Sequence, residues 1–220
     1  MKRLLAGTLL AVFGSMAMAI EEPGYDTVLA DDPYEVRQYR PMIVAETVVA
    51  GDLSGASNAG FRLIADFIFG NNTSPRGQRE KIEMTAPVMA EPASEKIEMT
   101  APVTVEPASE KIEMTAPVSV ADAGGLWRVH FVMPSKYTLE TLPRPNNPAV
   151  RIRELPSTRV AVVTFSGLAG ERKVAEKTDD LLRWIRSRGF TAAGKPQLAR
   201  YNPPWTLPFL RRNEVQVELK

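Results

Sequence analysis

The segment Glu-Lys-Ile-Glu-Met-Thr-Ala-Pro-Val occurs three times, at Glu80–Val88, Glu95–Val103 and Glu110–Val118, with a spacing of fifteen residues. In each copy apolar and other residues alternate, and in the first copy the apolar positions are Ile82, Met84, Ala86 and Val88. This period of two predicts a strand with one apolar face, followed by a type I turn that has Pro92 at its second position. Because the identity stops abruptly on both sides of residues 80–118, the copies indicate a tandem duplication inside a non-repetitive domain rather than a solenoid.

Every copy has a proline directly before its last apolar residue, at Pro87, Pro102 and Pro117. Proline removes a ladder donor and is tolerated in strands only at edges, ends or bulges. We therefore expect one copy in the sheet and an excursion formed by the other two. The third copy is favoured, since it would form the more local hairpin with the strand expected at Leu126–Met133.

The first nineteen residues have a basic start, an apolar run from Leu4 to Phe13 and small residues that end at Ala19. This pattern is typical of a secretory signal peptide (residues 1–19), and the apolar run is short for a membrane span. We therefore expect a single mature domain at residues 20–220, with no stable membrane anchor after cleavage. The absence of cysteine excludes disulfides, a lipid-modified cysteine and covalent c-type haem attachment, and an exported chain of this kind fits a bacterial periplasm.

The charge of the mature chain is nearly balanced. Removal of Lys2 and Arg3 leaves 27 − 2 = 25 basic residues against 26 acidic ones. This balance argues against nucleic acid as a partner.

A weaker internal repeat has an offset of 116 residues, because Val36–Gly51 resembles Ile152–Gly167. Each segment predicts two strands joined by a tight turn and followed by a helix, at Ser57–Phe69 and at Glu171–Arg188, and two more strands follow each helix. The predicted fold class is α+β: a pseudo-twofold distorted β-barrel of about eight strands, flanked by two helices and built from two β-β-α-β-β halves.

The first predicted helix is more apolar than one packed face requires, with a narrow polar strip of Asn58, Arg62 and Asp66. Two explanations stay open. The helix is deeply buried, or part of it forms the wall of a pocket for an apolar ligand.

The sequence lacks the motifs of common enzyme classes, such as a Gly-x-Ser-x-Gly elbow, a phosphate-binding loop or His-Glu-x-x-His. One histidine and no cysteine exclude nucleophile–base pairs built from those side chains, so we predict that the protein is not an enzyme. Strand alternation places the single histidine, His130, on the face opposite Trp127, Val129 and Phe131, as a structural histidine or as an axial haem ligand. The methionines of the copies, Met84, Met99 and Met114, could bind haem iron or Cu(I), but their alternation with Ile and Val favours core packing.

A second unusual segment, Tyr201–Glu214, has prolines and aromatic residues followed by Arg211 and Arg212. The prolines stiffen a loop that is expected to expose aromatic side chains. The two arginines could clamp a carboxylate such as a haem propionate, or they pair with Glu214 or lie in solvent.

Three pieces together resemble the SOUL haem-binding protein family: Tyr34–Tyr39, the repeated Lys-Ile-Glu-Met-Thr-Ala-Pro-Val followed by Phe131–Pro134, and Tyr201–Pro204 with Arg211–Glu214. The resemblance spans the mature chain. It implies a distorted β-barrel of two similar halves and noncovalent binding of haem or another tetrapyrrole, by an exported carrier or buffer.

The resemblance also implies a place for the ligand. In some members the first helix and the loop before the final Arg-Arg-Asn-Glu border a hydrophobic haem groove with basic residues near the propionates. Here the corresponding candidates are Phe61, Arg62, Ile64, Phe67, Ile68 and Arg211. The resemblance places no axial ligand, so His130 stays a candidate metal ligand from its own position in the sequence. Asp66 departs from this pattern, since an acid beside a propionate would repel it.

Two other functional classes remain open at this stage. The gyrase-inhibitor-like effector-binding fold has a similar two-half architecture, so the chain could be a general binding module for small apolar molecules. The repeated strands could instead form a contact surface of a structural or interaction protein.

Overall fold

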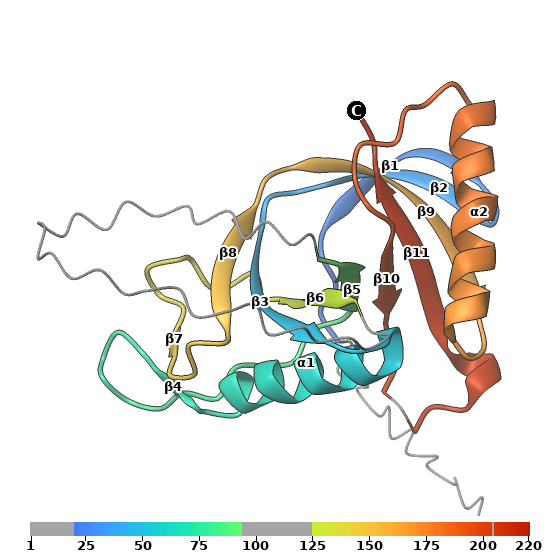
Figure 1. Cartoon of the computed structure of the whole chain (residues 1–220). Helices are drawn as coiled ribbons and strands as arrows, with labels where there is room; N and C mark the ends of the chain where they lie inside the picture. The colour runs from blue at the N-terminus through green and yellow to red at the C-terminus, as the bar shows by residue number, and fades with distance from the viewer. Residues whose placement is uncertain (1–19, 94–124, 204) are drawn as a thin grey trace, which may run out of the picture.

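The computed structural model describes residues 20–93, 125–203 and 205–220 of the chain. These residues form a strongly curled antiparallel sheet of nine strands with two helices (Figure 1). The strands of the sheet are β1 (Tyr25–Asp31), β2 (Tyr34–Tyr39), β3 (Met42–Ala50), β5 (Val88–Pro92), β6 (Leu126–Val132), β8 (Arg151–Leu155), β9 (Thr158–Ser166), β10 (Gln197–Arg200) and β11 (Arg212–Glu218). The helices are α1 (Leu53–Ile68) and α2 (Glu171–Ser187), and short elements are β4 (Asn72–Thr73), β7 (Arg144–Pro145) and the 3-10 turn η1 (Pro208–Leu210).

The strand order confirms the predicted pseudo-twofold symmetry. It runs β1-β2-β9-β11-β10-β5-β6-β3-β8. The two halves are β2-β3-α1-β5-β6 and β8-β9-α2-β10-β11. If β1 is left out and each strand is replaced by its equivalent in the other half, the same strand order results, read from the opposite end. Gly51 and Gly167, which the offset of 116 pairs, follow equivalent strands and both have positive φ, at 137° and 98°.

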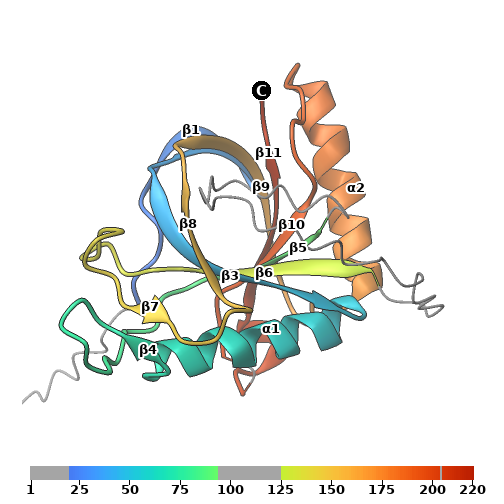
Figure 2. The same cartoon turned by 60° about the vertical axis from the view of Figure 1, so that its left-hand side comes forward.

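Both helices pack on the outer face of the curled sheet, and the main core lies between them and the strands (Figures 1 and 2). Helix α1 begins earlier than the pattern predicts because Asp52 caps it and accepts a hydrogen bond from the Gly55 amide. Gly60 lets α1 approach β6 closely, since a Cβ at this position would lie 2.6 Å from Val129. Both helices end beside a glycine with positive φ, Gly70 and Gly189, as predicted.

The first repeat copy is not the strand that its alternation predicts. Residues 80–87 have no regular strand, and the sheet strand β5 begins only at Val88. The amides of the copy have partners outside any ladder, because Ile82 donates to the Ile68 carbonyl and Ala86 donates to the Glu21 carbonyl. The copy is therefore an irregular segment that packs over the end of the sheet.

Two related predictions also need correction. Glu91 and Pro92 continue β5 opposite Arg128 and Trp127, so they do not form the predicted turn. Met84 is 41% exposed rather than packed in the core. The alternation was a misleading signal, because of the four apolar residues in this copy only Ile82 and Ala86 are buried.

The strand beside β6 follows the first copy and not the third, which corrects the preference for the third copy. The second and third copies, with Met99 and Met114, lie outside the described residues, as does the predicted signal peptide.

Candidate functional site

The apolar residues of α1 lie mainly in the core. Ile64, Phe67 and Ile68 are at most 1% exposed and pack between the helix and the sheet. Phe61 is half-buried with its ring 5.6 Å from that of Phe131, and Arg62 is exposed. Burial thus accounts for the apolar excess of this helix, the first of the two explanations left open by its sequence.

His130 lies on the other side of the sheet from α1. Its neighbours in β6, Val129 and Phe131, face the helix, whereas His130 faces the inside of the curled sheet with Glu46 and Met89 as its cross-strand neighbours. The structure therefore separates His130 from the α1 candidates, and one ligand cannot contact both groups. Its role as a metal ligand stays a prediction.

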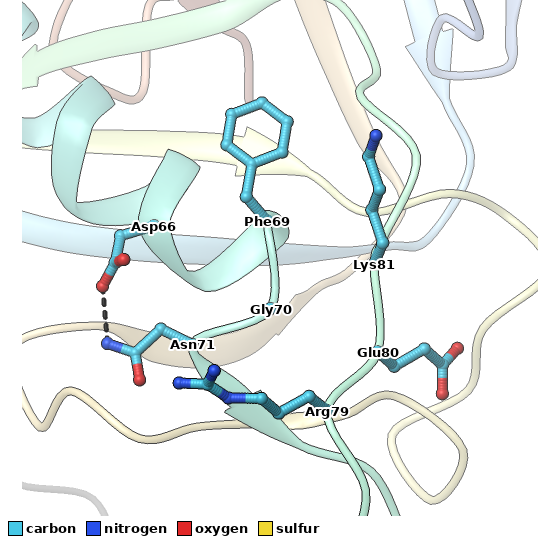
Figure 3. A pocket seen from close by; sticks show the side chains of 7 residues that line it. All are labelled: Asp66, Phe69, Gly70, Asn71, Arg79, Glu80 and Lys81. Carbon is cyan, nitrogen blue, oxygen red and sulfur yellow. Dashed lines mark hydrogen bonds between the residues drawn. The ribbon is translucent and has the colours of Figure 1, made fainter.

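A hollow of about 440 Å³ lies at the C-terminal end of α1 (Figure 3). Its lining is mostly polar and includes Arg79, Glu80 and Lys81, and Asp66 accepts a hydrogen bond from Asn71. The exposed Phe69 ring is its one aromatic group, with Lys81 Nζ 5.9 Å from the ring centroid. A large apolar ligand would find little apolar surface in this hollow.

Two loops at the ends of β9 and β10 carry an exposed apolar surface, with five of the six most exposed large apolar side chains of the described residues. We call it the loop patch; its members are Leu168 (64% exposed), Trp205 (82%), Leu207 (56%), Phe209 (70%) and Leu210 (62%). The two loops are joined by a hydrogen bond from the Gly167 amide to the Pro208 carbonyl. The loop that carries η1 is drawn in red before β11, and in both views it lies toward the bottom of the picture, as α1 does (Figures 1 and 2). Exposed apolar side chains gathered in this way are typical of a binding surface.

Two arginines belong to the same region. Arg211 is half-buried and donates from Nε to the Thr206 carbonyl within the loop. Arg200 donates to the Ala169 carbonyl, and burial together with the charge of Arg211 lowers its pKa. Burial is the larger cause of this shift, and the smaller effect of Arg211 reflects two like charges near each other beside the loop patch, where an anionic group would be stabilised.

Arg212, by contrast, is part of the fold. Its guanidinium donates to Glu214 Oε1 at 2.8 Å and to Glu22 at 3.0 Å, and its central carbon lies 3.8 Å from the centroid of the Tyr201 ring. The pairing with Glu214 was one of the alternatives that the sequence left open for this arginine.

The inside of the curled sheet holds a second cavity, of about 330 Å³, which includes His130. Apolar side chains form much of its wall, among them Tyr39, Met42, Met89 and Leu155. Arg128 and Arg153 contribute its positive charge. Burial, with a smaller effect of the two arginines, lowers the pKa of His130 to about 3, so the imidazole is neutral at pH 7.

The sequence did not predict most of the residues that form the loop patch or the cavity inside the curled sheet. The proline- and aromatic-rich segment was a usable signal for the loop patch, and it predicted exposed aromatics there. Leu168 gave no such signal, because its loop is distant in sequence and is brought beside the other loop by the pairing of β9 with β11. Arg128 and Arg153 come from distant parts of the chain, and only the order β6-β3-β8 brings them together.

Among the described residues, no cluster of three or more His, Cys, Asp or Glu side chains could hold a metal ion. Within the same residues, no helix is long and apolar enough to cross a membrane.

Solved structures with a similar fold share little sequence with this chain. The EcmrR C-terminal domain has a TM-score of 0.55 at 11% identity, over 89% of this chain and 98% of that one. An uncharacterized conserved protein from Listeria innocua has a TM-score of 0.56 at 12% identity, over 85% and 92%. A protein described as a hydrolase from Listeria innocua has a TM-score of 0.51 at 11% identity, over 85% and 91%. At these identities the likeness concerns the fold alone.

Comparison by sequence is more specific. No curated protein matches the chain significantly. Residues 20–218, nearly the whole chain, match the family described as SOUL heme-binding protein. This match agrees with the two-half curled sheet and with the motifs at both ends of the domain, and the chain therefore belongs to the SOUL haem-binding protein family.

Proposed function

We propose that the protein binds haem or a related tetrapyrrole noncovalently at the loop patch, as an exported carrier or buffer without catalytic activity of its own. The observation that carries the proposal is the exposure of the loop patch. Trp205 and Phe209 are 82% and 70% exposed, although burial of such a side chain is worth about 1.5–3 kcal/mol. A flat apolar ligand would cover them.

The charge beside the patch suits the polar edge of the same ligand. A haem carries two propionate carboxylates on one edge of an apolar plane. Arg200 and Arg211 provide guanidinium groups, which recognise carboxylates through paired N–H donors. The residues present therefore fit the group that the family is known to bind, and no axial ligand is assigned.

The test is a haemin titration of the mature protein, residues 20–220, followed through the Soret band. We expect saturation at about one equivalent, and an affinity at least about tenfold lower in the double variant Trp205→Ser, Phe209→Ser, since two ring contacts are lost. The matched control is Val28→Ser, Leu139→Ser, because these side chains are 51% and 54% exposed elsewhere on the surface. Equal weakening in both double variants, or a featureless titration of the unchanged protein, would refute binding at the loop patch.

The role of His130 is tested in the same assay. Because His130 faces the inside of the sheet, we expect the Soret spectrum of His130→Ala to match that of the unchanged protein. A shifted or lost Soret band in a variant that is folded by circular dichroism would instead support His130 as the axial ligand.

Export rests on the N-terminal sequence pattern alone. We expect the protein isolated from the periplasmic fraction of a Gram-negative host to begin at Ile20, as determined by intact-mass measurement. A retained Met1 in that fraction, or a protein confined to the cytoplasm, would contradict the assignment.

A further inference from the structure

The cavity inside the curled sheet has the character of a second, separate ligand site. It lies on the inner face, whereas the loop patch belongs to loops at the ends of the strands. Its walls come from strands at both ends of the sheet order, with Tyr39 from β2 and Arg153 from β8. A cavity of about 330 Å³ is at the lower end of the range for sites that hold small organic ligands.

Two buried nitrogen atoms, from residues that line this cavity, lack hydrogen-bond partners. They are His130 Nδ1 and Arg128 Nε, which belong to side chains two residues apart on the inner face of β6. His130 is only 2% exposed, and an unsatisfied polar atom at such a depth costs about 1–3 kcal/mol. Such atoms in a cavity wall are typical of a site completed by another molecule. Arg128 Nε can only donate, and the nearest carboxylate oxygen, Glu46 Oε2, lies 3.6 Å away, so a ligand oxygen could complete its hydrogen bonding.

The charges around these nitrogens favour an anion. A chain of ion pairs runs from Glu91 to Arg128 at 2.9 Å, from Arg128 to Glu46 at 3.6 Å and from Glu46 to Arg153 at 2.8 Å. The side chains of Glu91 and Glu46 are 12% and 13% exposed, while those of Arg128 and Arg153 are 30% and 42% exposed. Beside Arg128 and Arg153 the guanidinium groups are therefore more accessible than the two carboxylates that pair with them, while the exposed Glu218 lies elsewhere in the lining.

The remaining wall has an apolar, adaptable part beside the polar residues Thr158, Gln197 and Gln216. Met42 and Met89 have flexible thioether side chains, and Tyr39 and Leu155 add apolar surface. A ligand that suits both the positively charged groups and the apolar side chains of the wall has one carboxylate and a compact apolar body.

We propose that this inner cavity binds a small monocarboxylic acid with an aromatic or branched apolar body, its carboxylate directed at Arg128, Arg153 and His130. The site is distinct from the loop patch and does not depend on haem binding. In this arrangement the acid occupies the space between the two ends of the curled sheet and hydrogen-bonds to the two unsatisfied nitrogens.

The experiment uses benzoate as the probe, with neutral benzamide and cationic benzylamine as matched compounds of similar shape. The chain has one histidine, so protein labelled with ¹⁵N-histidine reports on His130 alone. We expect benzoate to shift the His130 signals saturably and to raise the melting temperature by mass action. We expect benzamide to bind at least about tenfold more weakly than benzoate, and benzylamine to cause no saturable change.

Two arginine variants test the location. Arg153 is on the edge strand β8 and 42% exposed, so Arg153→Met should fold, and we expect it to weaken benzoate at least about tenfold. Arg159→Met is the control, because Arg159 is exposed in β9 and does not line the cavity. Haemin affinity should be unchanged in both variants.

Three outcomes would overturn the proposal. They are unshifted His130 signals at millimolar benzoate, equal binding of benzamide or benzylamine, and equal benzoate affinity in Arg153→Met and Arg159→Met. A failed haemin titration would bear only on the loop patch, so the two sites are tested independently.

Discussion

At the scale of single residues, Glu214 joins the motifs at the two ends of the domain. Its carboxylate is 0% exposed and accepts hydrogen bonds from Arg37, Arg212, Tyr201 and Gln216. Burial raises the pKa of Glu214, but the charges and hydrogen bonds of Arg37 and Arg212 outweigh this effect and hold the pKa below its usual value. The motifs that carry the family resemblance at these positions therefore stabilise the fold.

Replacement of Glu214 by glutamine should strongly destabilise the protein. The variant leaves Arg37 buried without its charge partner, and loss of one member of a buried pair costs about 3–5 kcal/mol. The measurement is the free energy of unfolding from urea titration. Glu83→Gln is the control, since its pair with Lys136 is 69% and 54% exposed and should contribute less than about 1 kcal/mol. A loss below about 1 kcal/mol for Glu214→Gln would show that the network contributes little to stability.

His130 should make stability depend on pH in a window of its own. Its pKa is lowered from 6.5 to about 3, so below pH 6.5 the unfolded chain binds a proton that the folded protein does not. Stability is therefore full above pH 6.5 and falls as the pH decreases toward about 3, by about 1.4 kcal/mol per unit at most. Since ordinary carboxylates titrate near pH 4, we assign the slope between pH 6.5 and 5 to His130.

Urea titrations at several pH values would measure this slope. His130→Gln should be nearly flat between pH 6.5 and 5, because glutamine does not titrate. An equal slope in the variant and in the unchanged protein would exclude His130 as its source.

At the scale of elements, the sequence predicted the two helices correctly but not the structure of the first tandem copy, residues 80–88. Helix periodicity and terminal glycines are local properties, and both helices end as predicted. The alternation in the first copy is also local, but the partners of the Ile82 and Ala86 amides, Ile68 and Glu21, are set by the tertiary structure. Sequence reasoning had no access to those partners.

A deletion of residues 95–124 tests the assignment of β5 to the first copy. It joins β5 to β6 through Ala93, Ser94 and Gly125, and the Ala93 amide already donates to the Leu126 carbonyl. Shortening this connection about elevenfold should favour folding by up to about 2 kcal/mol in the logarithmic estimate. We therefore expect the thermal midpoint of the variant to equal or exceed that of the full chain.

The matched deletion removes the same number of residues, 80–109, and leaves only the third copy. Ser119, Val120 and Ala121 would then stand in place of Met89, Ala90 and Glu91. The variant loses the ion pair with Arg128 and the packing of Met89, and a valine crowds a site where Ala90 is 3% exposed. We expect a loss of about 2–4 kcal/mol relative to the first deletion. Equal stability of the two would mean that the copies are interchangeable in the sheet.

At the scale of the whole molecule, the two halves are related by symmetry but differ in their surroundings. β2 and β8 are equivalent strands, yet β1 covers the free side of β2, while β8 ends the sheet. β8 contributes Arg153 to the inner cavity, and β2 contributes Tyr39. The cavity therefore has one wall inside the sheet and one wall on its edge strand, β8.

Hydrogen exchange measured by mass spectrometry should reveal this difference. Among the described residues β8 pairs only with β3, so about half of its amides lack a ladder partner there, and we expect its peptide to exchange faster than that of β2. Saturating benzoate should slow exchange in β8 and β6, because the ligand contacts Arg153 and Arg128, and should leave the loop of Trp205 and Phe209 unchanged. Equal protection of β8 and β2 without ligand would show that another surface covers the β8 edge in solution. In that case entry to the cavity cannot depend on the opening of this strand.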